Sequence, residues 1–521
     1  MTVYDVLVVG AGSAGAPIAA RVSEDPSLAV LLLEAGADHP DPAATAPDLL
    51  DGLRLAGMAH DWHFSAEASP GRRIPYRRGK TVGGTSAINA AAATWPRPAD
   101  MDAWSALGNA AWSWAEMEPW LRRIECDTDA PDPSVHGQHG PLPIRRFKDD
   151  ALIPFQRGVA EACREALGLA AIADHNDVRR GEGVGPWPMN LRESGVRAST
   201  LLSWLGPARG RQNLTLRSEA LVDRLIVEEG RVSGVVLAGG EALRARRAVV
   251  LSAGALGTPA ILLRSGIGPT AELAALGIAP VLDRPGVGAR LYDHPAVAIR
   301  LVPRPGEADP VRDPRFQIVA RTVTRSGAPV FLVPVSFLDI SAAAALVAEA
   351  GGAPVVSLIN AALMRPRGHG RVRLAGPDPA SAPVIELDLL RDPADMADML
   401  EALRLAWRVA IAPPVAGVTR GIAGLDAATV ASDEALAAYA RANAATFNHP
   451  CGTAPMGPPG DPMAVADQLG RVRGIDGLWI ADASLMPAGV SVPPNVTVMA
   501  MGERIAAALR ADLRDGSRDG R

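Results

Sequence analysis

The sequence predicts an α/β fold in which a doubly wound sheet is interleaved with an α+β domain built on a mostly antiparallel sheet. Three observations carry this prediction. An apolar run of strand length, residues 3–9, leads directly into a glycine-rich turn and a helix. Strand-like apolar runs return far along the chain at 248–252 and 478–482. Between them, residues 316–337 alternate between apolar and polar positions, which is typical of antiparallel strands.

The N-terminal turn has the spacing of a dinucleotide-binding fingerprint. Gly10, Gly12 and Gly15 follow the G-x-G-x-x-G pattern between a strand and a helix. Gly10 permits the tight turn, Gly12 lets the backbone approach a pyrophosphate, and Gly15 lets helix and strand pack closely. Glu34 ends a second apolar strand, where an acid accepts hydrogen bonds from a ribose 2′-hydroxyl and disfavours the 2′-phosphate of NADP. The fingerprint predicts a Rossmann-like unit but does not distinguish FAD from NAD.

The composition excludes several functional classes. At 521 residues the chain is long enough for two or three packed units, and its net charge of −5 provides no basic surface for nucleic acid. The cysteines, Cys126, Cys163 and Cys451, lack metal-ligand spacing, and their odd number argues against a disulfide framework. We therefore expect a cytoplasmic protein without a metal site. The first strand begins at Val3 and no run reaches the ~18 apolar residues of a membrane span, so we expect neither a signal peptide nor a span.

Local patterns predict the other elements in chain order. Helical spacing of apolar positions predicts helices at 155–167, 394–411 and 497–509. Tryptophans between residues 95 and 120 are expected to anchor helices in the second domain. Short β-rich runs bounded by turn residues predict strands at 214–216, 220–228, 231–237, 248–252, 316–324, 330–337, 355–364, 371–374 and 478–482.

Three further motifs lie along the chain. Arg78–Asn89 is a second glycine-rich stretch, Gly254–Pro269 follows a buried strand, and Asn448–Gly457 contains His449. The last of them is followed by Asp482–Pro487. Together with the N-terminal turn, these motifs resemble the signatures of the glucose-methanol-choline (GMC) oxidoreductase family. The resemblance keeps the family's order and covers nearly the whole chain.

The resemblance implies that the cofactor is FAD. Some relatives bond the flavin covalently to a histidine at the position of Ile88, so an isoleucine there implies non-covalent binding. The family motifs assign FAD contacts to Gly10, Gly12, Ser13, Ala14, Gly15, Glu34, Ala35, Arg78, Gly79, Val82, Gly83, Gly84, Ser86, Asn89, Ala90, Val222, Ala253, Gly254, Asp482, Ala483, Asn495 and Val496.

The resemblance also implies an interleaved arrangement of domains. The FAD-binding domain is expected to comprise residues 1–99, 206–295 and 446–521, the last of which carries the active-site histidine. Residues 296–445 are expected to form the substrate-binding domain. Residues 100–205 are expected to contribute mainly substrate-domain and lid segments.

His449 is the residue that the resemblance implies as catalytic. Alcohol oxidation requires removal of the hydroxyl proton while hydride leaves the same carbon for flavin N5, and a neutral imidazole suits the first task. The electrons then pass to oxygen or to another acceptor. Family members commonly place a second histidine or an asparagine 44 residues later, where this chain has Pro493. Asn495 either substitutes for that partner or contacts the flavin through its backbone, and both possibilities stay open.

Other interpretations remain at this point. A hydroxynitrile lyase on the same FAD framework, with a non-redox flavin, is the alternative function, although lyase-type members more often keep two histidines. His294 resembles a family loop near the flavin domain, and its interpretation as a structural turn residue is the stronger one. The expected partners are a small-molecule alcohol and oxygen or another electron acceptor, for a monomer or a homodimer. The sequence specifies neither the alcohol nor the choice between oxidase and dehydrogenase.

Overall fold

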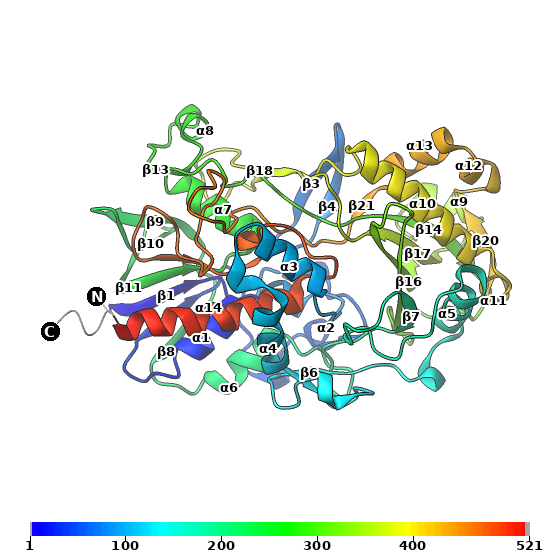
Figure 1. Ribbon diagram of the computed structural model, residues 1–521, viewed down its shortest axis with the longest axis horizontal. Coiled ribbons are helices and arrows are strands. Elements are labelled where there is room, and N and C mark those ends of the chain that lie inside the picture. The colour runs from blue at the N-terminus through cyan, green and yellow to red at the C-terminus, as the bar shows by residue number, and fades with distance from the viewer. Residues whose placement is uncertain (1–2, 516–521) are drawn as a thin grey trace.

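The computed structural model describes residues 3–515 and shows two parts, each with its own sheet and helices. The part that contains the first strand and the last helix lies at the left of Figure 1 and holds a mainly parallel sheet. The other part lies at the right and holds an antiparallel sheet. The chain passes between the two parts several times, so segments distant in sequence meet at their boundary.

Parallel strands form the core of the first sheet, in the spatial order β8 (Leu214–Arg217), β2 (Val30–Leu33), β1 (Tyr4–Val9), β11 (Ala242–Leu251) and β22 (Leu478–Ile480). Every residue of β2 is apolar and buried, as expected for a parallel strand covered on both faces. The first half of β11 pairs instead with an antiparallel hairpin formed by β9 (Val222–Glu228) and β10 (Arg231–Leu237).

The helices of this part pack on the sheet and on one another. The first helix, α1 (Gly15–Val22), contacts the last, α14 (Asn495–Asp515), which also contacts α4 (Trp114–Ile124). The remaining helices here are α2 (Pro47–Leu50), α3 (Pro98–Ala106), α6 (Gly206–Ala208), α7 (Gly254–Arg264) and α8 (Thr270–Ala275). Within residues 3–515, no helix has the length and apolar character needed to cross a bilayer.

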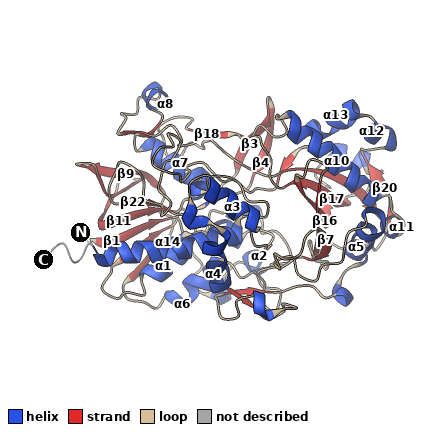
Figure 2. Ribbon diagram, viewed as in Figure 1, coloured by secondary structure: helices blue, strands red, loops and turns tan. Residues whose placement is uncertain are grey.

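The second part is built on an antiparallel sheet. Its strands follow the order β20 (Thr419–Ala423), β14 (Pro295–Pro303), β17 (Val355–Leu363), β16 (Pro329–Asp339), β15 (Ile318–Val323) and β7 (Gly183–Pro186), and β21 (Ala445–Thr446) pairs with the start of β14. The helices of this part, seen at the right of Figure 2, are α5 (Pro154–Leu167), α9 (Ala344–Glu349), α10 (Pro393–Ala410), α11 (Pro413–Ala416), α12 (Ala427–Ala431) and α13 (Asp433–Asn443). Of these, α5, α10, α11 and α13 pack directly on strands of the sheet.

Smaller sheets complete the fold. The largest lies between the two main sheets in Figure 1 and has the order β18 (Arg371–Arg373), β19 (Val384–Glu386), β3 (Phe64–Ser69) and β4 (Arg72–Tyr76). Short pairs are formed by β5 (Glu125–Asp127) with β6 (Leu142–Ile144) and by β12 (Ile267–Gly268) with β13 (Leu282–Asp283).

The predicted fold class is confirmed, and two predicted elements extend six residues beyond one of their expected ends, from 248 to 242 and from 509 to 515. The strand predicted at 248–252 begins at Ala242, because its first half pairs with the β9–β10 hairpin. The closing helix predicted at 497–509 runs from Asn495 to Asp515, because α1 and α4 pack along it. Tertiary contacts therefore extend both elements beyond the limits that local sequence indicates.

The tryptophans anchor helices, but against the first part of the molecule. Trp104 Nε1 donates to the carbonyl oxygen of Ala488 (3.0 Å), and Trp112 Nε1 donates to that of Gln468 (2.6 Å). Both indoles are fully buried. The expectation that they pack in the second domain was wrong, because their partners lie in the C-terminal segment that returns to the parallel sheet. The domain limits themselves stay a prediction.

A buried ionic cluster fixes the segment that follows α4. His136 Nδ1 lies 2.8 Å from Glu125 Oε1, and its Nε2 lies 2.7 Å from Asp174 Oδ2. Arg146 donates to both Asp127 and Asp174. Burial alone would lower the pKa of His136, but the hydrogen bonds to Asp174 and Glu125 outweigh it and raise the pKa to about 9. At neutral pH the cluster therefore contains two cations, His136 and Arg146, beside three carboxylates, those of Glu125, Asp127 and Asp174.

This cluster makes stability depend on pH in a defined direction. The folded-state pKa of His136 lies above its ordinary value of 6.5. The contribution of this histidine to the free energy of unfolding is therefore fully present below pH 6.5 and is lost as the pH rises through about 9. We expect the thermal midpoint to fall over this range, and to fall less in the variant His136→Gln. Melting curves of both proteins, followed by circular dichroism between pH 6.5 and about 9, measure the difference. An equal fall of the thermal midpoint with pH in the two proteins would contradict the raised pKa of His136.

Candidate active site

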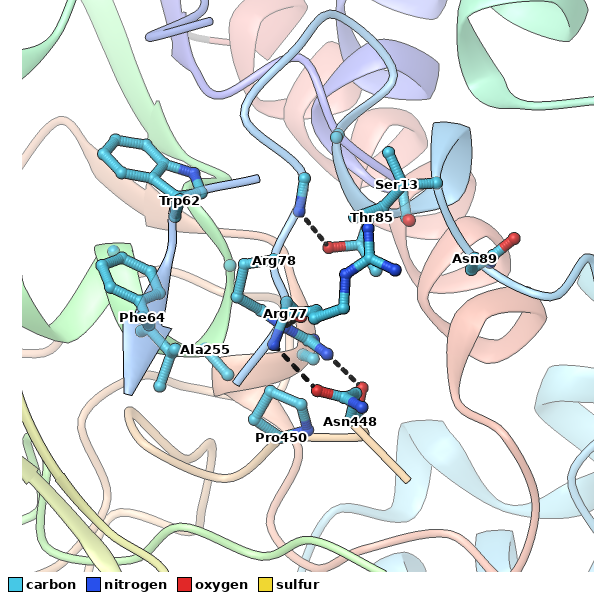
Figure 3. Close-up of a pocket in the computed structure, with 18 of the residues that line it drawn as sticks. Ser13, Trp62, Phe64, Arg77, Arg78, Thr85, Asn89, Ala255, Asn448 and Pro450 are labelled. Carbon is cyan, nitrogen blue, oxygen red and sulfur yellow. Dashed lines mark hydrogen bonds between the residues drawn. The ribbon is translucent and has the colours of Figure 1, made fainter. Parts of the chain in front are cut away.

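A cavity of about 750 Å³ opens between the two parts of the molecule. One side is formed by the turn after β1, the start of α7 and the start of α14. The facing wall comes from β16 and β17 of the antiparallel sheet, and the segment from β3 to Asn89 lines a third side. Figure 3 shows part of this lining. Ser13, Arg78 and Asn448 come from distant segments of the chain and lie around the same cavity.

Glycines let the two glycine-rich turns touch at this cavity. A Cβ atom at Gly84 would lie 2.8 Å from Gly12 Cα, which is closer than real Cβ contacts come. Gly10 has a φ of 98°, and a Cβ there would lie 2.4 Å from the carbonyl oxygen of Ser252. In contrast, a Cβ at Gly254 would meet nothing within 4 Å. The result is a bare backbone cradle with open space in front of it, which fits a dinucleotide.

Most of the residues predicted to contact FAD line this cavity. They are Gly10, Gly12, Ser13, Ala14, Glu34, Ala35, Arg78, Gly79, Gly84, Asn89, Ala90, Val222, Ala253, Gly254, Asp482, Ala483 and Asn495. The other predicted contacts, Gly15, Val82, Gly83, Ser86 and Val496, are not lining residues. Ser86 Oγ donates to the carbonyl oxygen of Gly83 (2.6 Å), so this hydrogen bond stabilises the turn without lining the cavity. Their contact with a cofactor stays a prediction.

Two buried carboxylates organise the cradle. Glu34 accepts hydrogen bonds from the backbone N–H groups of Ala11 (3.0 Å) and Gly36 (2.9 Å). Burial raises the pKa of Glu34 to about 7, against the effect of these backbone bonds. Asp482 accepts from the Gly254 N–H (2.9 Å) and from Thr258 Oγ1 (2.6 Å), and burial raises its pKa as well. Asp482 thus fixes the start of α7 at the cavity.

Asn495 begins α14 at the edge of the cavity. Its Oδ1 accepts a hydrogen bond from Ser13 Oγ (2.8 Å), which ties α14 to the first glycine-rich turn. Its Nδ2 is buried and has no hydrogen-bond partner among residues 3–515. An unused amide donor beside the N-terminus of a helix suits an oxygen-rich, anionic ligand such as the diphosphate or pyrimidine edge of FAD.

The segment that carries His449 is held by one buried carboxylate. It leaves the antiparallel sheet after β21, and the His449 N–H donates to Asp293 Oδ1 (2.9 Å). The same carboxylate accepts from Tyr76 Oη (2.5 Å), from Thr446 Oγ1 and from the His294 N–H (2.7 Å). Asp293 therefore joins the end of β4, the turn before β14 and the histidine segment at one point.

His449 and His294 are hydrogen-bonded to each other. Their Nδ1 atoms lie 2.9 Å apart, and His294 Nε2 lies 2.8 Å from the carbonyl oxygen of Val490. A carbonyl only accepts, so His294 Nε2 carries a proton and its Nδ1 is the acceptor. His449 Nδ1 must then be the donor, which leaves a lone pair on His449 Nε2. Both rings are neutral in this arrangement, in agreement with burial lowering the pKa of each.

Asn448 connects the histidine segment to the second glycine-rich stretch. It adopts a φ of 61°, a left-handed conformation that asparagine tolerates better than most residues. The Arg77 N–H donates to Asn448 Oδ1 (3.0 Å), and the Arg78 guanidinium donates to the Asn448 carbonyl oxygen, as Figure 3 shows. The base candidate and the cofactor cradle are therefore attached to one stretch of chain.

Arg197 shapes the loops beside the cradle and was not identified from the sequence. Its side chain is fully buried, and burial lowers its pKa to about 10. Instead of a carboxylate, it binds six backbone carbonyl oxygens, those of Asp48, Leu49, Asp51, Arg54, Ala87 and Asn89. No local pattern distinguishes Arg197 from an exposed arginine, because its partners are backbone atoms of distant segments.

His294 and the facing wall of the cavity were also missed. The sequence favoured a structural role for His294 in a turn, whereas the structure shows it hydrogen-bonded to His449. The signal that could have indicated this contact was the resemblance of the His294 segment to a family loop near the flavin domain. Pro493 lines the cavity as well, but a proline side chain offers no hydrogen bond. Wall residues such as Trp187, Arg315 and Asn360 carry no motif, because their arrangement depends on strand pairing.

Comparisons with known proteins agree with this geometry. Family models described as GMC oxidoreductase match residues 4–296 and 366–502. The chain is 34% identical to 5-(hydroxymethyl)furfural oxidase of Methylovorus sp. (strain MP688), over 98% of this chain and 99% of that protein. It is 33% identical to choline oxidase of Arthrobacter globiformis, over 98% and 94% of the two chains.

Solved structures show the same architecture. The crystal structure of pyridoxine 4-oxidase from Mesorbium loti superposes with a TM-score of 0.85 at 30% identity, covering 97% of this chain and 99% of that one. A formate oxidase structure, at 24% identity, shares the fold with a TM-score of 0.87 over 99% of both chains. Since the family models and the relatives extend along almost the whole sequence, the chain belongs to the GMC oxidoreductase family, whose oxidases and dehydrogenases are FAD-dependent enzymes acting on CH–OH donors.

Proposed function

We propose that this protein oxidises an alcohol with non-covalently bound FAD and with His449 as the general base. The observation that supports this most is the hydrogen-bond chain from Val490 through His294 to His449. That chain leaves Nε2 of His449 unprotonated, and His449 lines the cavity that also contains the dinucleotide cradle. Ile88 lines the same cavity and provides no nucleophile for a covalent flavin bond, which supports non-covalent binding.

The chain's residues divide the work of the reaction. Gly12, Gly254 and the start of α14 would hold FAD, which when bound supplies the acceptor for hydride from the carbinol carbon. His449 Nε2 removes the hydroxyl proton. Its Nδ1 proton stays in the bond to His294, which keeps the ring in position while it becomes cationic.

We assign Asn495 to FAD and not to His449. Its Oδ1 is already used by Ser13, and no hydrogen bond joins it to His449 among the described residues. His294 acts instead as the polar partner of His449. It belongs to the segment before β14 and not to the segment that contains Pro493. Its orienting role offsets the loss of a polar side chain at position 493.

Oxygen is the electron acceptor that the relatives support best. Those named above are oxidases of 5-(hydroxymethyl)furfural, choline and pyridoxine. A hydroxynitrile lyase is not favoured, because these relatives are oxidases and because the second catalytic position is Pro493. Anaerobic mixing with alcohols, followed by air and a peroxide assay, tests oxidation and the acceptor together.

Removing the base should slow flavin reduction without emptying the cofactor site. We expect His449→Ala to lower the anaerobic reduction rate by roughly 10²–10⁴-fold, the usual contribution of a general base. The matched control is His139→Ala, which removes an exposed histidine outside the cavity. Stopped-flow absorbance measures the rate, and near-normal reduction in His449→Ala would remove this residue from the role.

The acid limb of the pH profile should lie below pH 6.5. Burial first, and then His294 and Arg78, lower the pKa of His449 well below its ordinary 6.5. The base must be neutral, so kcat/KM is expected to persist at about pH 6 and to fall only when the pH drops through the lowered pKa. A profile of kcat/KM against pH checks this, and an inflection at or above 6.5 would be inconsistent with the buried, cation-flanked imidazole.

His294 should act as a positioning residue. His294→Phe removes the acceptor of the Nδ1 proton and frees the tautomer of His449, and we expect roughly 10²-fold slower flavin reduction. A wrong tautomer costs up to about 10⁴-fold in a serine protease triad. His294→Asn, which retains an acceptor, should recover part of the rate. FAD content and thermal midpoint monitor folding, and a rate loss that follows loss of FAD in both variants would make the role merely structural.

A further inference from the structure

Arg315 is a cation in the cavity without an anionic partner. It lines the cavity, and no carboxylate lies within ion-pair distance of it among residues 3–515. Its Nε is buried and lacks any hydrogen-bond partner within the described part of the chain. Burial lowers the pKa of its guanidinium, and Arg77 adds to this effect. Arg315 thus lines the cavity and has a hydrogen-bond donor that the described residues leave unused.

The position of Arg315 is fixed by its backbone and by two rings. Its N–H donates to the carbonyl oxygen of Leu53 (2.9 Å), and its own carbonyl accepts from the N–H of Ser336 on β16 (3.0 Å). The guanidinium carbon lies 5.9 Å from the ring centre of Phe316 and 5.7 Å from that of Phe337. These contacts orient the guanidinium but leave its N–H groups available.

The wall beside Arg315 is mostly apolar. Val335 pairs with Leu358 and Val333 with Asn360 across β16 and β17, and all four line the cavity. Residues two apart on a strand share one face, so these side chains form a single patch. Phe316 and Trp187 pack edge to face beside it, with ring centres 6.0 Å apart. An apolar or aromatic body fits this wall better than a sugar, because Asn360 is its main uncharged polar group.

The other arginines of the cavity are already occupied. Arg77 pairs with Asp61 (2.9 Å) and Arg264 with Asp223 (3.1 Å). The Arg78 guanidinium donates to the carbonyl oxygens of Arg77 and Asn448. Arg315 is therefore the guanidinium on the antiparallel-sheet side that has donors left for a ligand, whereas the dinucleotide cradle lies on the other side.

We propose that the cavity binds alcohols that carry a carboxylate on an apolar or aromatic body, and that Arg315 binds this carboxylate. A planar guanidinium matches a carboxylate with two parallel N–H···O bonds. The proposal rests on the proposed alcohol oxidation, and the carboxylate itself is unchanged in that reaction. Arg77 lies near both groups, since its charge lowers the pKa of Arg315 and its N–H donates to Asn448, the neighbour of His449.

Binding of unreactive probes tests the role of Arg315 independently of turnover. Benzoate and benzamide have the same shape but differ in charge, and titration against the FAD-loaded protein is followed by the change in flavin absorbance. We expect benzoate to bind more tightly than benzamide, and Arg315→Met to weaken benzoate by about 30-fold, as when one partner of a buried charge pair is removed. Benzamide affinity should change little.

Kinetics with a matched substrate pair completes the test. With 4-(hydroxymethyl)benzoate, Arg315→Met should raise KM with a smaller effect on kcat, whereas 4-(hydroxymethyl)benzamide should be oxidised as by wild type. Arg315→Lys should recover part of the preference, because lysine keeps the charge but loses the planar fork. The control variant is Arg312→Met, in which the lost cation is exposed, pairs with Asp313 and lies outside the cavity.

The outcomes separate the two proposals. Equal affinity of wild type for benzoate and benzamide, or equal weakening of both probes in Arg315→Met, would overturn the carboxylate assignment. Absence of flavin bleaching by any alcohol, with benzoate binding still dependent on Arg315, would instead overturn alcohol oxidation and leave the anion site in place.

Discussion

The close approach of the two glycine-rich turns is the constraint on which the cavity depends. A Cβ atom at Gly84 would lie only 2.8 Å from the Cα atom of Gly12. Residues without a side chain are therefore required where these turns meet. The stretch that contains Gly84 ends at Asn89, whose carbonyl binds Arg197, and it is preceded directly by Arg77, whose N–H donates to Asn448. The cradle, its supporting loops and the histidine segment are thus parts of one connected unit. A displacement at the glycine contact would move all three.

If His449 is the base, as proposed, the histidine pair explains how a proline is tolerated at position 493. A base needs one ring nitrogen held and the other free, and His294 holds Nδ1 of His449 through a tautomer fixed by the Val490 carbonyl. Asp293 fixes both histidines through their backbone N–H groups. Because these contacts come from the segment before β14, the orientation of His449 does not depend on a side chain at Pro493.

Features encoded in consecutive residues could be predicted from the sequence, whereas features that depend on contacts between distant segments could not. The turn at Gly10, the acid at Glu34 and the histidine motif are encoded in consecutive residues, so their place at the cavity could be predicted. Arg197 could not, since its partners are carbonyls of two separate loops. The partner of His449 was sought by its distance along the chain, whereas the structure brings His294 from 155 positions earlier.

Arg197 and Arg315 show two different uses of a guanidinium withdrawn from water, which is fully buried in Arg197 and partly buried in Arg315. Withdrawing such a cation from water costs several kcal/mol unless its donors are satisfied. The fold satisfies Arg197 completely with backbone carbonyls, which makes it a structural centre. Arg315 receives only the faces of Phe316 and Phe337, and such contacts contribute about 0.5–2 kcal/mol each. Since its N–H groups remain unpaired at an apolar wall, the missing interaction is one that a ligand carboxylate supplies. A neutral alcohol cannot make this interaction and therefore gains no affinity from Arg315.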